Sequence, residues 1–232
     1  MLFDKIIYIN LKHRKDRNKN VLNVLSSVSK YPHDLLSMTM RFEAVYGKSL
    51  DLNLLNTNII SKQAIGDAIK NTSVYTTMTI GGIGCALSHY YIYKYIIANN
   101  INKCLILEDD ISMDADFINK CIYINKQLDA EKVDFDLLFL GYHDTSDKYS
   151  YKHTSTFNKF NRIYGLFGYI VSYKGAQKLL SNIFPLVQQI DSEISNKSNK
   201  INIIGVNNLN KIIISDQSDV ASKFGTDIQI MT

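Results

Sequence analysis

Short apolar runs rich in β-branched residues alternate with stretches of helical periodicity along this chain, and that alternation restricts its fold more than any other feature. The apolar runs have the length of buried strands, and the helical stretches repeat their apolar residues every three or four positions. The predicted strands are 5–11, 41–45, 103–107, 136–140, 164–172, 201–206 and 211–215. The predicted helices are 16–29, 61–70, 81–99, 116–128 and 175–181. Such an order predicts the α/β class, with a mainly parallel sheet flanked by helices.

The composition is that of a globular chain with enough apolar residues for a sizeable core. Hydrophobic residues make up 46% of its 232 residues. Lys and Arg number 26 against 22 Asp and Glu, and a net charge of +4 is too small to indicate a nucleic-acid partner. Since no repeat, low-complexity tract or linker divides the chain, we predict a single domain over 1–232.

Features of membrane and exported proteins are missing from the sequence. No apolar run reaches the roughly 18 residues of a membrane span. The first residues, Met1–Lys5, lack the basic and apolar regions of a signal peptide. Three cysteines without paired spacing argue against a disulfide framework and a structural zinc knuckle. We therefore expect no transmembrane segment and a cytoplasmic location, in a bacterium or, for a virus-encoded chain, in the host cell or virion.

Three consecutive carboxylates follow the predicted strand 103–107 directly: Glu108, Asp109 and Asp110. In open α/β sheets, ligands bind beyond the carboxyl ends of the strands. Adjacent carboxylates repel one another unless a cation lies between them, and oxygen ligands suit Mg²⁺ or Mn²⁺. The alternative is a solvated loop, or acids at the start of the next helix. Both interpretations fit the triplet taken alone.

A basic stretch follows the first predicted strand, with Lys12, Arg14, Lys15, Arg17 and Lys19 close together. Guanidinium groups bind phosphate through two hydrogen bonds, and a helix N-terminus adds its dipole. The alternative is a solvated first turn of a helix. Considered together, the acidic and basic strand ends suggest a nucleotide diphosphate whose charge is shared between a metal and the protein.

Other motifs exclude some functions and leave others open. Gly81-Gly-Ile-Gly84 is not a dinucleotide-binding fingerprint, and neither a P-loop nor a G-x-S-x-G elbow is present. Cys85 and His89 share one helix face, but without further supporting spacing a packed thiol and a hydrogen-bonded imidazole are the favoured interpretation. Asp191 and Glu193, after Pro185, resemble surface acids when taken in isolation.

The order of several motifs is more specific than any of them alone. The two strongest are Gly82-x-Gly-Cys-x-x-Ser-His89 and Leu107-Glu-Asp-Asp-Ile111. The others are Ile9-Asn-Leu-x-x-Arg-x-Asp-Arg17, Phe42-x-Ala44 with Gly47-Lys48, Asp136-Leu-Leu-x-Leu-Gly141, Gly168-Tyr-x-Val-Ser172 with Gly175-Ala176 and Lys178-Leu179, Ile190-Asp191, and Gln217 with Thr226-Asp-Ile228. In this order the chain resembles glycosyltransferase family 25, the lipopolysaccharide-type and procollagen galactosyltransferases.

The resemblance implies a GT-A-like fold, a nucleotide-sugar donor, a divalent Mn²⁺ or Mg²⁺ ion and inversion at the anomeric carbon. The donor is expected to be UDP-linked, with galactose first and glucose or N-acetylglucosamine open. The expected acceptor is a glycan, a lipid-linked glycan or a glycoprotein. Residues to about 141 would bind the donor, and the later residues would face the acceptor.

Site residues follow from the same resemblance. The expected metal ligands are Glu108, Asp109 and Asp110. The expected donor-binding residues are Asn10, Leu11, Arg14, Arg17, Gly84, His89 and Asp109. Asp191 is the expected base, with Glu193 second. Two rivals remain at this point: a degenerate, non-catalytic binding module and a metal-dependent nucleotidyltransferase.

Overall fold

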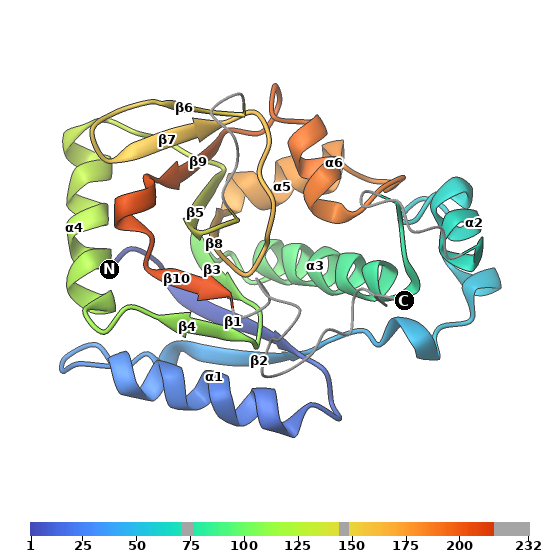
Figure 1. The fold of residues 1–232 in the computed structure, drawn as a ribbon, viewed down its shortest axis with the longest axis horizontal. Helices are drawn as coiled ribbons and strands as arrows, with labels where there is room; N and C mark the ends of the chain where they lie inside the picture. Colours follow the sequence, from blue (N-terminus) through green and yellow to red (C-terminus); the bar gives the residue numbers. More distant parts are fainter. Residues whose placement is uncertain (71–76, 144–148, 216–232) are drawn as a thin grey trace.

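The structure of the chain is a computed structural model that describes residues 1–70, 77–143 and 149–215. The expected closing motif at 217–228 lies outside these residues. An eight-stranded sheet runs through the centre in the order β2-β1-β3-β8-β5-β9-β7-β6 (Figure 1). Its strands are β1 (Lys5–Asn10), β2 (Thr39–Glu43), β3 (Lys103–Leu107), β5 (Leu137–Gly141), β6 (Ser150–Lys152), β7 (Phe157–Phe160), β8 (Gly168–Ser172) and β9 (Ile203–Val206). Only β8 and β7 run opposite to the other strands of this sheet.

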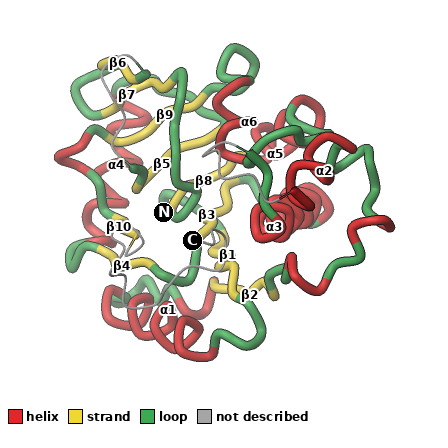
Figure 2. The backbone as a smooth tube through the Cα atoms, turned by 45° about the vertical axis from the view of Figure 1, so that its right-hand side comes forward, coloured by secondary structure: helices red, strands yellow, loops and turns green. Residues whose placement is uncertain are grey.

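Helices cover both faces of the sheet. They are α1 (Lys15–Val28), α2 (Lys62–Lys70), α3 (Ile80–Ala98), α4 (Phe117–Ala130), α5 (Tyr173–Asn182) and α6 (Ile190–Asn196). Figure 2 shows α3 with α5 and α2 on one side of the strands, and α4 with α1 on the other. None of the described helices combines the length and the apolar character that crossing a bilayer requires. The predicted α/β architecture is confirmed.

Alternation along the strands divides the core into two layers. In β3, Cys104 and Ile106 pack on the side of α3, whereas Leu105 and Leu107 pack on the side of α1 and α4. Successive strand residues point to opposite faces, so a strand buried on both sides has no polar positions. This explains why β3 is apolar without interruption from Cys104 to Leu107, after the partly exposed Lys103 at its start.

The strand predicted at 164–172 is shorter, since β8 begins only at Gly168. Two larger features also differ from the sequence predictions. The loop predicted at 142–158 is wrong, because β6 and part of β7 lie within it and pair with each other. Strand β6 forms the edge of the sheet, where its polar residues can face solvent. In addition, β4 (Ile111–Met113) pairs with β10 (Ile213–Ser215) in a separate two-stranded sheet. Strand β4 begins directly after the acidic triplet, so it fixes the chain on that side of the three carboxylates.

The arrangement of β1, β2 and β3 determines where a ligand site can form. These three strands are neighbours and run parallel. Their carboxyl ends, at Asn10, Glu43 and Leu107, therefore lie at one edge of the sheet. The basic stretch and the acidic triplet both start at this edge, as the sequence predicted.

Candidate active site

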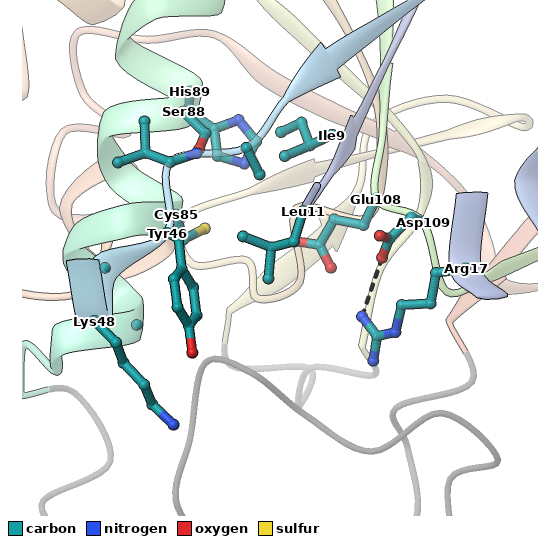
Figure 3. Close-up of a pocket in the computed structure, with 14 residues that line it drawn as sticks. Ile9, Leu11, Arg17, Tyr46, Lys48, Cys85, Ser88, His89, Glu108 and Asp109 are labelled. Carbon is teal, nitrogen blue, oxygen red and sulfur yellow. Dashed lines mark hydrogen bonds and ion pairs between the residues drawn. The ribbon is translucent and has the colours of Figure 1, made fainter. Parts of the chain in front are cut away.

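A pocket lies at this edge, between the ends of β1 and β3 and the first half of α3 (Figure 3). Four parts of the chain line it besides the Arg17 side chain of α1. They are Ile9 and Leu11 at the end of β1, residues 44–48 after β2, the α3 residues Gly81, Cys85, Ser88 and His89, and Glu108 with Asp109 after β3. The structure thus brings the two predicted strand ends together around one cavity.

Glycines let the segment after β2 lie directly on α3. A Cβ at Gly84 would come within 2.7 Å of the Gly47 nitrogen and closer still to the Val45 carbonyl oxygen. Nearby, the Ser88 hydroxyl accepts a hydrogen bond of 2.9 Å from the Val45 nitrogen. Gly84 is not among the described residues that line the pocket. Its place in the structure is therefore one of backbone packing, which shapes the wall formed by residues 44–48.

Asp109 is held by two side chains from the start of the chain. The Asn10 amide nitrogen donates to Asp109 Oδ2 at 2.6 Å, and Arg17 Nη1 donates to Asp109 Oδ1 at 3.0 Å. Arg17 Nη1 also lies 3.2 Å from Asp110 Oδ2. All four residues are buried, and Asp110 is only 1% exposed. Arg17 therefore balances the charge of two of the three clustered acids.

Glu108 differs from its two neighbours because it approaches α3 rather than α1. Glu108, Cys85 and His89 each place one atom that could bind a metal within 4.8 Å of the other two. Burial, followed by the charges of Asp110 and Asp109, raises the pKa of Glu108 to about 8. Burial and the nearby Glu108 charge also raise the pKa of the Cys85 thiol. This side of the pocket therefore favours the neutral forms of both groups in the absence of a cation.

His89 is wholly buried at the inner end of the pocket. Its Nδ1 lies 2.8 Å from the Tyr169 hydroxyl, which lies 2.8 Å from the Tyr93 hydroxyl. His89 Nε2 forms no hydrogen bond with any of the described residues. Burial lowers the pKa of this histidine to about 3, so its imidazole is neutral near pH 7.

Arg14 and Leu11 take different positions at the start of α1. Leu11 lines the pocket. Arg14 pairs with Asp16 through Nε at 3.1 Å and Nη2 at 2.9 Å. That salt bridge lies at the surface of the first turn, where the Asp16 side chain is 54% exposed.

The two candidate bases lie in the first turn of α6, with different surroundings. Asp191 Oδ1 accepts a hydrogen bond of 2.7 Å from the Ser192 nitrogen. Burial raises the pKa of Asp191, and its charge in turn contributes to the raised pKa values of Glu108 and Cys85. Asp191 is therefore within electrostatic reach of the pocket. Glu193 instead accepts hydrogen bonds from the Val187 and Gln188 nitrogens, at 2.8 and 3.0 Å, and holds the turn before α6.

The pocket contains residues to which the sequence analysis gave no role. Tyr46 and Lys48 form part of its wall, and the Tyr46 ring packs edge-on against His13, with 5.0 Å between ring centroids. The signal was present in Gly47-Lys48, which belongs to the motifs quoted above. Its position beside α3 depends on the parallel pairing of β2 with β1, which the sequence alone did not give.

The donor atoms around the pocket bear on which metal they fit. Asp109 and Asp110 are both engaged by Arg17, so the triplet does not present three equivalent oxygen ligands. Glu108 faces a nitrogen and a sulfur atom across the pocket. The described side chains that could share a metal ion with Glu108 on the pocket side are therefore those of His89 and Cys85.

Comparisons with known proteins agree on one group. A family profile described as glycosyltransferase family 25 (LPS biosynthesis protein) matches residues 3–194. Human procollagen galactosyltransferase 2 is 31% identical over 205 residues, which cover 86% of this chain and 31% of the human protein. The human inactive glycosyltransferase 25 family member 3 is 27% identical over 141 residues, covering 60% and 22% of the two chains. This chain spans about a third of the length of the curated relatives it matches.

Among solved structures, a UDP-glucose pyrophosphorylase complexed with UDP-glucose has a TM-score of 0.42 and 10% identity, with 88% of this chain and 90% of that chain covered.

Proposed function

The chain belongs to glycosyltransferase family 25, and we propose that it is a hexosyltransferase with a GT-A-like fold. It transfers the sugar of a UDP-linked donor to a hydroxyl of a glycan, lipid-linked glycan or glycoprotein, with inversion. The observation that supports this function most directly is a single pocket lined by Glu108, Asp109 and residues of α3. Asp191 lies close enough for its charge to affect Glu108 in that pocket. UDP-galactose is the first donor to test, because the relatives are named procollagen galactosyltransferases.

The donor is proposed to lie along the ends of β1 and β3. Asn10 and Arg17 hold the Asp109 carboxylate in place, and Asp109 with Leu11 forms the floor beneath the nucleotide. Lys48 brings a cationic side chain to the same pocket and is suited to a diphosphate oxygen. Arg14 is not one of the described residues that line the pocket and pairs with Asp16 instead.

Metal assistance belongs to this proposal, with Mn²⁺ or Mg²⁺ as the first candidates and Glu108 as the pocket-side ligand. A divalent ion would neutralise the charge that develops on the leaving diphosphate. The negative charges of Asp110 and Asp109 lie close enough to raise the pKa of Glu108. The same charges would attract a cation to this carboxylate. A bound cation would favour the ionised form of Glu108.

Inversion requires a base on the acceptor hydroxyl, and Asp191 is the proposed group. Burial raises the pKa of Asp191, which makes its carboxylate a stronger proton acceptor than an exposed aspartate. Glu193 is the second choice, because two backbone nitrogens already bind its Oε1. Residues beyond about 141 thus supply the acceptor side of the site.

A non-catalytic binding role is the second candidate, because one human relative bears the name of an inactive family member. A panel of UDP-galactose, UDP-glucose and UDP-N-acetylglucosamine, incubated with the full chain and Mn²⁺, separates the two roles. The proposal expects UDP release from one donor, increased by a hydroxyl acceptor and lost in Asp191→Asn. Donor binding without UDP release would support the binding module. Release of pyrophosphate would instead indicate a nucleotidyltransferase.

A further inference from the structure

We propose that Cys85, His89 and Glu108 form a metal site that prefers a transition ion such as Zn²⁺ or Co²⁺ to Mg²⁺. For the role of the ion this inference rests on the proposed function, but it replaces Mg²⁺ as a candidate at Glu108 with an ion that accepts sulfur and nitrogen ligands. For the binding of the ion it rests on the three side chains alone. The sequence favoured a packed thiol and a hydrogen-bonded imidazole for Cys85 and His89. His89 does form a hydrogen bond, to Tyr169, and the position of both side chains opposite Glu108 adds a metal-binding role.

The backbone brings the three ligands together from two elements. Cys85 and His89 lie one helical turn apart on α3, so their side chains project from the same face. Glu108 follows β3 and meets that face across the pocket (Figure 3). Zinc bonds of about 2.0–2.3 Å place tetrahedral ligand atoms about 3.3–3.7 Å apart. Since the ligand atoms lie within 4.8 Å of one another, movement of side chains by about 1 Å closes the site.

The buried imidazole supplies a second, independent observation. His89 is 0% exposed, and its Nε2 meets no hydrogen-bond partner among the described residues. Leaving a buried nitrogen unsatisfied is unfavourable, because it has lost its hydrogen bonds to water without replacement. The opposite nitrogen, Nδ1, is paired with Tyr169 at 2.8 Å, and Tyr93 supports that hydroxyl in turn. Metal-binding histidines show this arrangement, in which a fixed partner orients the ring and leaves the other nitrogen for the ion.

The chemistry of the ligands determines the kind of ion. Thiolate and imidazole favour zinc and other transition metals, whereas Mg²⁺ requires oxygen ligands in a nearly ideal octahedron. Three protein ligands leave a fourth position, which faces the cavity here. Sites with three ligands and one open position are the kind that bind a substrate or water. An oxygen of the donor diphosphate matches that position under the proposed function.

Cobalt reports directly on a sulfur ligand. The full chain, freed of metal, is titrated with Co²⁺ while its absorption spectrum is recorded, with no sugar donor present. We expect a thiolate-to-cobalt charge-transfer band with tetrahedral visible bands, and an excess of Mg²⁺ that does not displace the ion. Cys85→Ser should abolish the charge-transfer band, and His89→Gln and Glu108→Gln should each weaken binding at least tenfold. Cys121→Ser is the control, since the Cys121 thiol is buried on α4 in the opposite core layer, away from the pocket.

A spectrum without the charge-transfer band, or one that persists in Cys85→Ser, would overturn the site. Displacement of Co²⁺ by equimolar Mg²⁺ would also overturn it, in favour of oxygen ligands alone. A second measurement needs no variant: alkylation of Cys85 in the native chain, followed by peptide mass spectrometry. Zn²⁺ should slow this alkylation at least tenfold, and equal rates with and without Zn²⁺ would contradict the site. Cobalt binding without UDP release from any donor would uphold the site and overturn the proposed function.

Discussion

Arg17 Nη1 lies 3.0 Å from Asp109 Oδ1, although 92 residues separate the two in sequence. The same nitrogen lies 3.2 Å from Asp110 Oδ2, and the side chains of all three residues are at most 8% exposed. The residues after β1 and the residues after β3 therefore form ion pairs with each other, and these side chains are not all available to a ligand. Arg17 balances the charges of Asp109 and Asp110 on the side of α1. Glu108 instead lies close to Cys85 and His89 of α3.

Arg17→Ala is expected to destabilise the fold. It leaves two buried carboxylates without their guanidinium, and loss of one partner of a buried ion pair costs about 3–5 kcal/mol. Urea denaturation measures the change in the free energy of unfolding. Lys30→Ala is the matched control, because Lys30 and Asp116 are about half exposed and a surface pair contributes about 0–1 kcal/mol. Equal losses in the two variants would mean that Arg17 is not part of a buried pair.

Gly84→Ala should destabilise the wall of the pocket. The added methyl group would lie within 2.7 Å of the Gly47 nitrogen, so α3 and residues 45–47 must separate, at a cost of about 1–3 kcal/mol. Gly66→Ala in α2 is the contrasting change, because nothing lies within 4 Å of its added Cβ. That substitution should stabilise the chain by about 0.4–1 kcal/mol. Thermal unfolding of both variants checks the pair, and a stabilising Gly84→Ala would contradict the close contact.

The metal-free chain should lose stability in acid through His89. Burial lowers the pKa of His89 to about 3 in the folded chain, from 6.5 in the unfolded one. Between those values the unfolded chain binds a proton that the folded chain excludes, so stability falls as pH drops from 6.5 toward 3. The slope reaches about 1.4 kcal/mol per pH unit between the two pKa values, and it fades as the pH rises past 6.5.

Urea denaturation in EDTA across this pH range gives the slope. His89→Gln should flatten the curve relative to the wild type, whereas His153→Gln, at an exposed position, should follow it. Identical slopes for the wild type and His89→Gln would show that His89 is not held neutral in the folded chain.

Local patterns predicted the central layers of the fold because burial dictates composition there. The strand predicted at 103–107 is confirmed with the same bounds, since its residues 104–107 are covered on both faces and are all apolar. Strand β6 escaped prediction because it lies at the sheet edge and carries exposed polar residues such as Tyr151 and Lys152. Its pairing partner, rather than its own sequence, makes it a strand.

The site was predictable only in part for a related reason. Strand ends were recognisable because charged residues stop an apolar run, as Glu108 does after Leu107. Which charged groups face each other depends on strand order, and the pairing of β1 with β3 brings Arg17 to Asp109 rather than to open solvent. The approach of Cys85 to Glu108 likewise depends on how α3 packs on the sheet, about which helical spacing gives no information.

Asp191→Asn separates a base from a structural acid. If Asp191 takes the proton of the acceptor hydroxyl, its loss should lower transfer by about 10²–10⁴-fold. Asn keeps an oxygen for the Ser192 nitrogen, so the first turn of α6 should persist and donor binding should change little. Steady-state UDP release, with donor affinity measured separately, gives both quantities. Collapse of donor affinity with normal turnover of the bound donor would place Asp191 in the donor site instead.

The pH profile adds a test that a purely structural residue would not pass. A base acts only when deprotonated, so kcat/KM should fall as pH drops through the pKa of Asp191, which burial raises above the usual aspartate range. In Asp191→Asn this acidic limb should disappear from the residual activity. Glu193→Gln is the neighbouring control: its Oε1 binds the Val187 and Gln188 nitrogens, so the change should lower stability while the limb remains. A limb that survives in Asp191→Asn and vanishes in Glu193→Gln would exchange the roles of the two acids.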